Sequence, residues 1–232
     1  TGILGDTIDI HGGGADLEFP HHTNEIAQSE AKTGKTFANY WMHNGFVNID
    51  NVKMSKSLGN FITVHDALKT IDGQVLRFFF ATQHYRKPIN FTEKAVRDAE
   101  TNLKYLKNTY EQPFTGEVDT AELQSFVDKF IAAMDEDINA ANGITVVFEL
   151  AKWINSGHYN QDVKDALTKM LEVFGVVFVE EVLDADIEAL IAERQEARAK
   201  KDFARADAIR DELAAQGIKL LDTKEGVRWT RD

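Results

Sequence analysis

The first third of the chain alternates short apolar runs with polar or glycine-rich stretches, which indicates strands interleaved with helices. An apolar run that stops at a triple glycine predicts a buried strand over residues 3–10. A helix is expected next, with Pro20 in its first turn and Gly34 at its end. The aromatic and β-branched content of residues 40–49 predicts a second strand, which leads into a polar loop.

Beyond that loop the apolar residues recur at helical spacing. Thr63 followed by Asp66 resembles a capping box and predicts a helix start. From about residue 72 onward, several apolar stripes with short connections predict four or five consecutive helices, and Thr92 is the expected cap of one of them. Consecutive helices joined by short loops favour a helical bundle.

The last 47 residues have a pattern of their own. They predict a charged helical hairpin over residues 186–200 and 203–216, closed by Gly217. Two short strands, residues 218–221 and 227–229, are expected to flank a turn. The tail is therefore predicted to be a small α+β module.

Composition restricts the chemistry. With 232 residues and 43% apolar content the chain suits one large or two modest globular domains. No apolar run approaches the roughly 20 residues of a membrane span, and the first residues lack a signal-peptide pattern, so we expect a soluble cytoplasmic protein. The chain has no cysteine, so any metal ligand within it must be His, Asp or Glu.

The net charge of −12 argues against a globally basic, nucleic-acid-binding surface. Residues 193–231 nevertheless carry ten Lys and Arg against eight Asp and Glu, so any nucleic-acid contact is expected there. Trp229 offers a ring for stacking on an unpaired base. A solvated hairpin with ion pairs explains the same charges. The candidate phosphate contacts are Arg194, Arg198, Lys200, Lys201, Arg205, Arg210, Arg228 and Arg231.

Lys53-Met-Ser-Lys56-Ser57 lies in a polar loop, with Gly59 and Asn60 just beyond it. Two cations this close together suit successive phosphates of a nucleotide, and the flexible flanks let such a loop close. An ordinary solvated loop is the competing interpretation for any Lys-Ser-Lys trio.

Three further sets of residues are candidates for a site. His21 and Glu25 are four apart at the start of the predicted helix, so both side chains can converge on one metal, with His22 as the rival ligand; a helix-surface hydrogen bond is the plainer explanation. The Gly12–Gly14 run permits close approach of a nucleotide, although a glycine-rich turn is usually only a turn. Asp16 can accept a ribose hydroxyl, and isolated histidines such as His11 and His43 are commonly structural.

Taken together, these segments resemble cysteinyl-tRNA synthetases, which are class I aminoacyl-tRNA synthetases. The tail segments Ala204–Arg210 and Asp222–Trp229 also resemble the small anticodon-recognising module of bacterial members. The segments that carry the main resemblance are His11-Gly-Gly-Gly-Ala-Asp16, Phe19-Pro-His21-His22-Thr-Asn24-Glu25, Tyr40-Trp-Met-His43-Asn-Gly-Phe46 and Lys53-Met-Ser-Lys56-Ser-Leu-Gly-Asn60.

The resemblance implies a ligase that activates L-cysteine with ATP and Mg²⁺ and transfers it to the 3′ end of tRNA(Cys). Lys53 and Lys56 would be the catalytic phosphate-binding lysines, and His21 and Glu25 would hold one zinc ion together with two cysteines. Zinc would take the substrate thiolate directly, which a serine hydroxyl cannot match. Further ATP contacts would come from Gly13, Gly14 and Asp16, and His11 and His43 would face the substrate pocket.

The resemblance also implies an architecture. We expect the C-terminal part of a Rossmann-like catalytic domain over residues 1–52, the lysine loop and a helical stem over 53–90, a tRNA-binding bundle over 91–184, and an anticodon-recognition module over 185–232. The His-x-Gly-His signature and the two zinc cysteines of the family do not occur in this sequence. We therefore expect a C-terminal fragment that is inactive alone, with exposed apolar surface, whose intact parent is a monomer.

Two other functions fit parts of the sequence. A related ligase joins cysteine to an amino sugar with the same adenylation chemistry, but it should lack the anticodon module. A non-catalytic tRNA-binding or regulatory protein derived from a synthetase would explain the missing signature. The intact lysine loop, His21 and Glu25 favour a working enzyme over both.

Overall fold

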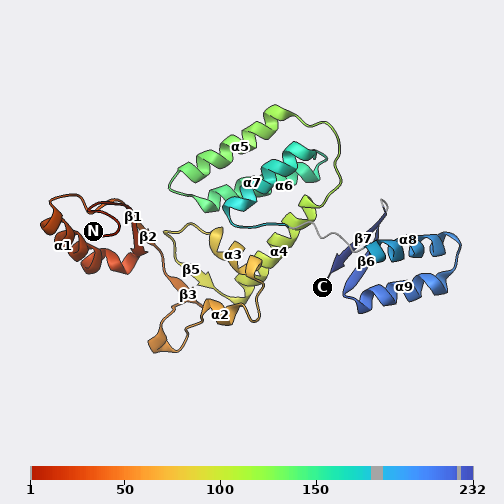
Figure 1. Ribbon diagram of the computed structural model, residues 1–232, viewed down its shortest axis with the longest axis horizontal. Coiled ribbons are helices and arrows are strands. Elements are labelled where there is room, and N and C mark those ends of the chain that lie inside the picture. Colours follow the sequence, from red (N-terminus) through yellow and green to blue (C-terminus); the bar gives the residue numbers. More distant parts are fainter. Residues whose placement is uncertain (1, 179–184, 224–225, 232) are drawn as a thin grey trace. The chain divides into compact units, whose positions relative to one another are not determined.

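The computed structural model describes residues 2–178, 185–223 and 226–231. The chain divides into two compact units, Thr1–Phe178 and Val179–Asp232 (Figure 1). An α/β region followed by a helical bundle and a small α+β module confirms the predicted fold class. None of the helices described combines the length and the apolar character that crossing a membrane requires.

The chain of the first unit begins with a β-α-β arrangement. Strands β1 (Ile8–Gly14) and β2 (Ala38–Asn44) pair in parallel, and helix α1 (Thr23–Thr33) connects them. Two short helical turns, Ala15–Leu17 and Glu18–His22, precede α1. Pro20 lies in the second of these turns, and α1 ends as expected at Gly34, whose φ of 66° suits a glycine.

The predicted strand over residues 3–10 is wrong in its bounds and in its burial. Strand β1 begins at Ile8 and includes all three glycines, because its ladder with β2 runs from Ile8 opposite Ala38 to Gly14 opposite Asn44. Ile3 is 96% exposed and Ile10 61% exposed. The apolar run therefore does not mark the strand, whose extent is set by its partner.

The predicted strand over residues 40–49 is also wrong, because the chain changes sheets within it. Strand β2 ends at Asn44, and β3 (Val47–Ile49) belongs to a second sheet with the order β4-β3-β5. A Cβ on Gly45 would lie 2.4 Å from the backbone of Lys87, so only glycine allows this close approach. The two strands that pair with β3 are β4 (Val52–Lys53) and β5 (Ile89–Phe91).

The lysine loop follows β4, and a helical stem follows the loop. The loop contains a short 3₁₀ turn, Lys56–Leu58, and leads to α2 (Val64–Ala67). Thr63 caps α2 as predicted, since its hydroxyl accepts a hydrogen bond from the Asp66 amide at 3.0 Å. Helix α3 (Gly73–Ala81) comes next.

Four longer helices form the bundle predicted from the apolar stripes, and each begins at a side-chain cap. The capping residues are Thr92, Asp119, Asn139 and Asn160. Leu106, Leu150 and Ile154 are fully buried in the shared core, which α3 also enters through Phe78 and Phe79. The helices are α4 (Glu93–Tyr110), α5 (Thr120–Asp135), α6 (Ala140–Asn155) and α7 (Gln161–Val173).

The second unit is a helical hairpin followed by an antiparallel strand pair. Its small core is formed by Ile187, Ile209, Leu213 and Ile218. Gly217, with a φ of 77°, follows the second helix as predicted. The expected turn at 222–226 lies partly outside the described residues. The elements are α8 (Ala185–Ala199), α9 (Phe203–Ala215), β6 (Ile218–Thr223) and β7 (Gly226–Arg231).

Candidate functional site

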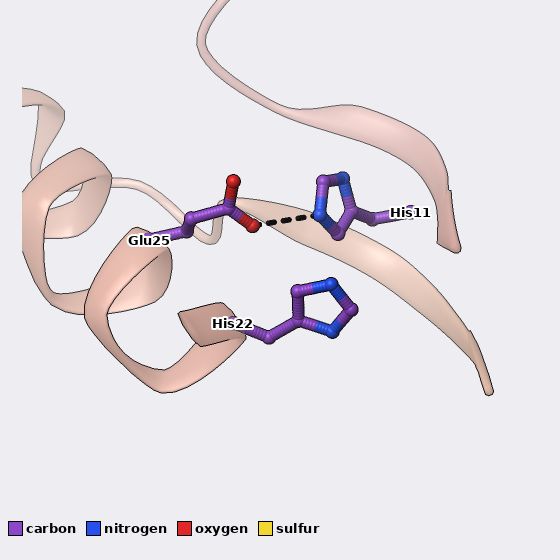
Figure 2. A group of neighbouring side chains, drawn as sticks. All are labelled: His11, His22 and Glu25. Atoms are coloured by element: carbon purple, nitrogen blue, oxygen red, sulfur yellow. Dashed lines mark hydrogen bonds and ion pairs between the residues drawn. The ribbon is translucent and has the colours of Figure 1, made fainter. Parts of the chain in front are cut away.

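Glu25 on α1 lies between two histidines, one on each side of its carboxylate. His11 Nε2 on β1 is 2.8 Å from Glu25 Oε2 (Figure 2), and His21 Nε2 is 3.3 Å from Glu25 Oε1. The first contact is a hydrogen bond that fixes the orientation of the carboxylate. The second results from the four-residue spacing on consecutive helical turns. The structure therefore brings the predicted ligands His21 and Glu25 together, and it adds His11 to them.

The spacing between His21 and Glu25 suits a metal ion. Two donor atoms bound to one tetrahedral zinc about 2.0–2.1 Å away lie about 3.3 Å apart. His21 Nε2 and Glu25 Oε1 have this separation, and both donor types are common zinc ligands. The His21 side chain is 60% exposed and that of Glu25 32% exposed, so His21 is open to solvent while Glu25 is partly buried. The residues present thus fit two of the four ligands of a zinc site.

His22 is the deeper of the two adjacent histidines, being only 3% exposed. Its Nδ1 lies 2.8 Å from His43 Nε2, and its ring stands beside His11 and Glu25 (Figure 2). Burial lowers the pKa of His22, and the neighbouring His11 and His43 lower it further. One donor atom each from His11, His22 and Glu25 lies within 4.8 Å of the others, so these three form a second candidate ligand set.

An aromatic ring closes one side of this histidine group. Trp41 on β2 lies 4.8 Å from His11, 5.1 Å from His22 and 6.2 Å from His43, measured between ring centroids. In the β1–β2 ladder, His11 stands opposite Trp41 and Gly13 opposite His43. The two candidate pocket histidines therefore belong to neighbouring strands with Trp41 between them.

The glycines of β1 make room for side chains of the protein itself. A Cβ on Gly13 would lie 2.8 Å from His22 Cε1 and 2.9 Å from its Nε2. A Cβ on Gly14 would lie 2.6 Å from a carboxylate oxygen of Asp16. Gly13 thus leaves space for the His22 ring. The sequence had suggested only that the glycines leave space for a nucleotide.

Lys53, the first lysine of the loop, lies at the end of β4. Its Nζ is 3.4 Å from Asp16 Oδ2 and 3.8 Å from the centroid of the Phe46 ring. Lys53 therefore forms an ion pair with Asp16, the residue predicted to contact the ribose, and both side chains are about half exposed. The side chain of Lys56 lies outside the described part of the structure.

Asn60 holds the lysine loop together from its far end. Its Oδ1 accepts a hydrogen bond from the Ser55 amide at 2.9 Å, and its Nδ2 donates to the Lys53 carbonyl at 3.3 Å. The hairpin before the loop is held in a similar way. Asn90 on β5 accepts from the Asn51 amide at 2.8 Å and donates to the Asn51 side chain at 2.9 Å.

The tail unit has a hollow of about 190 Å³ between its two helices. Phe203 on its rim is 61% exposed, whereas Trp229 packs partly buried against the small core. An exposed ring beside several guanidinium groups suits an unpaired base and its phosphates. The hollow is lined by Arg194, Arg198, Phe203, Ala206, Asp207 and Arg210.

Sequence reasoning missed several of these residues. Trp41, Asn60 and Asn90 stood in or near the predicted segments, but no role was assigned to them. The two-residue spacing of Trp41 and His43 was the available signal, because alternate residues of a strand face the same side. The pairing of Asn90 with Asn51 left no local signal, since 39 residues separate them.

Three family models match the chain in succession. Residues 1–101 match the class I (C) catalytic domain of tRNA synthetases, and residues 129–180 match the DALR domain. Residues 180–229 match the anticodon-binding domain of cysteinyl-tRNA ligase. The chain belongs to the cysteinyl-tRNA ligase family. This finding confirms the resemblance seen in the sequence.

Curated relatives in this family match over the full chain. The cysteine–tRNA ligase of Streptococcus pneumoniae serotype 4 is 86% identical over all 232 residues, and that of Streptococcus mutans serotype c is 83% identical. The chain spans about half, 52%, of the length of each. It corresponds to a C-terminal part of these family members.

A solved structure supports the fold at low sequence identity. The LeuRS of Agrobacterium radiobacter K84, crystallised as a ternary complex with tRNA and LeuAMS, superposes with a TM-score of 0.52 at 15% identity. The match covers 74% of this chain and 27% of that one. Most of this chain therefore shares its fold with part of that structure.

Proposed function

We propose that the protein to which this chain belongs activates L-cysteine with ATP and transfers it to the 3′ end of tRNA(Cys). The observation that carries this proposal is the 86% identity to a cysteine–tRNA ligase over the 232 residues of the chain. On this proposal the chain supplies part of the catalytic centre and the tRNA-binding regions. The isolated chain does not complete the reaction.

The lysine loop acts on the phosphates of ATP. Lys53 and Lys56 stabilise the negative charge that develops as the adenylate forms and pyrophosphate leaves. Asn60 and Asn90 hold the two ends of the segment that presents these lysines. Binding of the nucleotide replaces the contact between Lys53 and Asp16, which frees Asp16 for the ribose. Mg²⁺ accompanies ATP as part of the substrate.

The histidine group forms the amino-acid side of the site. His21 and Glu25 hold one zinc ion with two cysteines from the remainder of the protein, and His11 orients the Glu25 carboxylate from behind. When bound, zinc would act as a borderline-soft Lewis acid, which favours a thiolate over a hydroxyl. His43 and Trp41 line the pocket, and the hydrogen bond between His22 and His43 fixes the His43 ring.

The helical bundle and the tail bind tRNA. The proposed domains are residues 1–52, 53–90, 91–184 and 185–232, with the last one reading the anticodon. The hollow beside Phe203 accommodates an anticodon base, because the exposed Phe203 ring and the side chains of Arg198 and Arg210 line it. The protein acts as a monomer in the cytoplasm.

The experiment uses a full-length chimera that joins this chain to the N-terminal half of the 86% identical Streptococcus pneumoniae ligase. Aminoacylation of tRNA(Cys) is measured with labelled cysteine and, separately, with labelled serine. We expect cysteinyl-tRNA to form and seryl-tRNA to stay at background. A chimera that folds and binds ATP but charges no tRNA with cysteine would refute the proposal.

Zinc content separates the two possible ligand sets. His21→Ala is expected to lose zinc and cysteine activation together, whereas His22→Ala retains bound zinc. Glu100→Gln, an exposed change on α4, is the matched control and leaves zinc at one per protein. Loss of zinc from His22→Ala with full zinc in His21→Ala would instead assign the site to His11, His22 and Glu25.

A further inference from the structure

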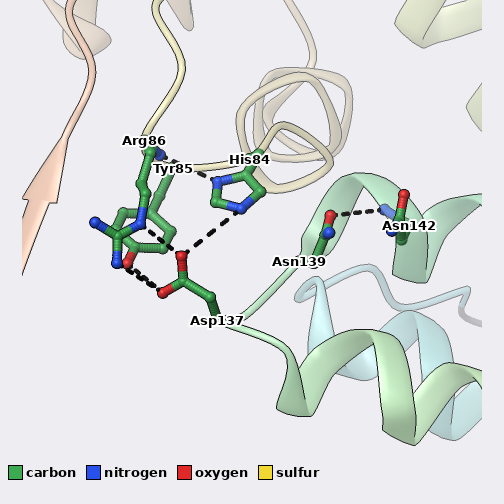
Figure 3. Close-up of polar contacts among 6 residues, drawn as sticks. All are labelled: His84, Tyr85, Arg86, Asp137, Asn139 and Asn142. Carbon is green, nitrogen blue, oxygen red and sulfur yellow. Dashed lines mark hydrogen bonds and ion pairs between the residues drawn. The ribbon is translucent and has the colours of Figure 1, made fainter.

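Asp137, in the turn between α5 and α6, is held by three consecutive residues that follow α3 in the chain. The Arg86 guanidinium donates to both carboxylate oxygens, from Nε at 2.5 Å and from Nη2 at 3.0 Å (Figure 3). The Tyr85 hydroxyl donates at 2.6 Å, and His84 Nε2 lies 3.9 Å away. A two-pronged guanidinium contact with a carboxylate fixes relative orientation as well as distance.

The turn that carries Asp137 has an unfavourable backbone conformation. Asp137 has a φ of 56° and Ile138 a φ of 51°, which are left-handed values. Aspartate tolerates this region, but a β-branched residue such as Ile138 seldom adopts it. The Asn139 side chain then accepts from the Asn142 amide at 3.1 Å and caps α6 (Figure 3). The grip on Asp137 and the cap on α6 together hold the turn in this conformation. Arg86 and Tyr85 also keep the pKa of the Asp137 carboxyl at about 2, so it stays charged.

The same short segment touches the catalytic region on its other side. The Gly45 amide donates to the Tyr85 carbonyl at 2.7 Å, and Gly45 packs directly against the backbone of Lys87. Strand β5 begins two residues later and pairs in parallel with β3. Strand β3 in turn pairs with β4, at whose end Lys53 lies.

We propose that Asp137 is a positioning residue for the lysine loop, linking the α5–α6 end of the bundle to the sheet that presents Lys53. The inference rests on the proposed function, because ATP is the ligand whose binding it affects. Only Lys87 and Pro88 separate Arg86 from β5, so a shift of the turn that carries Asp137 moves the edge of that sheet. The bundle and the ATP site are thereby coupled through residues 84–91.

The test uses the full-length chimera at 25 °C and measures cysteine-dependent ATP–pyrophosphate exchange. We expect Asp137→Ala to raise the KM for ATP about tenfold, with zinc content and the KM for cysteine unchanged. Asp137→Asn keeps an acceptor oxygen without the charge and should be intermediate. The double variant Arg86→Ala/Asp137→Ala should have the same KM for ATP as Asp137→Ala, because each substitution removes the same Arg86–Asp137 ion pair. Asp98→Asn, which breaks an ion pair within α4, is the control and should behave as the parent.

Hydrogen exchange provides a second readout that needs no activity. Asp137→Ala is expected to speed amide exchange in residues 47–53 while leaving α1 unchanged. A variant with parental ATP kinetics and parental exchange in residues 47–53 would overturn the inference. Equal losses in ATP use, cysteine use and zinc would do so too, since they indicate general unfolding. A parent chimera without pyrophosphate exchange would refute the proposed function, and hydrogen exchange would still decide the role of Asp137.

Discussion

Replacing Gly13 with alanine is expected to push the His22 ring out of its position, because the added methyl group would clash with it. The new methyl group would lie 2.8 Å from His22 Cε1, 2.9 Å from Nε2 and 3.0 Å from Leu17 Cδ1. Carbon atoms seldom approach closer than 3.4 Å, so the His22 ring must retreat by about 0.6 Å. The ring has little freedom to do so, because it is buried and hydrogen-bonded to His43.

The energetic cost follows from these contacts. Overfilling a packed site costs about 1–3 kcal/mol. A retreat of this size along the bond to His43 would stretch it from 2.8 Å to about 3.4 Å, near the limit for a hydrogen bond. Losing that bond adds about 0.5–1.5 kcal/mol. We therefore expect Gly13→Ala to destabilise this region by about 2–4 kcal/mol and to displace the His43 ring from its place in the proposed substrate pocket.

The neighbouring glycine provides a matched control. A Cβ on Gly12 would lie 3.5 Å from the Met42 carbonyl oxygen, which is ordinary contact. Both alanine variants of the chimera are compared by urea unfolding and by the KM for cysteine in pyrophosphate exchange. Gly12→Ala should stay close to the parent in both assays, whereas Gly13→Ala should unfold at lower urea and bind cysteine more weakly. Equal behaviour of the two variants would refute the packing argument.

Three further predictions concern the first unit. Leu150→Ala removes a fully buried side chain from the bundle core and should lower the free energy of unfolding by about 2–5 kcal/mol, measured by urea denaturation. The contacts with Arg86 and Tyr85 lower the pKa of the Asp137 carboxyl from 3.8 to about 2. Its stabilising contribution is therefore complete above pH 3.8 and is lost as the pH falls towards 2. A carbon-NMR titration should show this pKa, and Arg86→Ala should return it towards 3.8. Asn90→Ala removes two hydrogen bonds to Asn51 and should weaken the β3–β4 hairpin by about 1 kcal/mol, seen as faster amide exchange at Asn51.

The helices could be predicted from sequence because their signals are local. Thr92 and Thr63 cap helices through bonds to residues three positions away, and the apolar stripes report burial one turn at a time. The strands expected at residues 3–10 and 40–49 were placed wrongly, because their pairing depends on residues distant in sequence. Nothing near Gly45 indicates that Lys87 will pack against it and divide the expected strand in two.

In the candidate site, too, contacts between residues close in sequence could be predicted and contacts between distant residues could not. The spacing of His21 and Glu25 was enough to predict that their side chains converge, and their donor atoms lie 3.3 Å apart. The hydrogen bond from His11 to Glu25 spans β1 and α1, so no spacing rule could supply it. The burial of His22 under Gly13 likewise depends on how the turn before α1 folds back over the strand.

Cysteine-dependent ATP–pyrophosphate exchange tests the central claim most directly. The full-length chimera is compared with the isolated 232-residue chain, each with cysteine and with serine as substrate. We predict robust exchange for the chimera with cysteine only, and background exchange for the isolated chain with either amino acid. Robust exchange by the isolated chain, or a chimera that prefers another amino acid, would contradict the account.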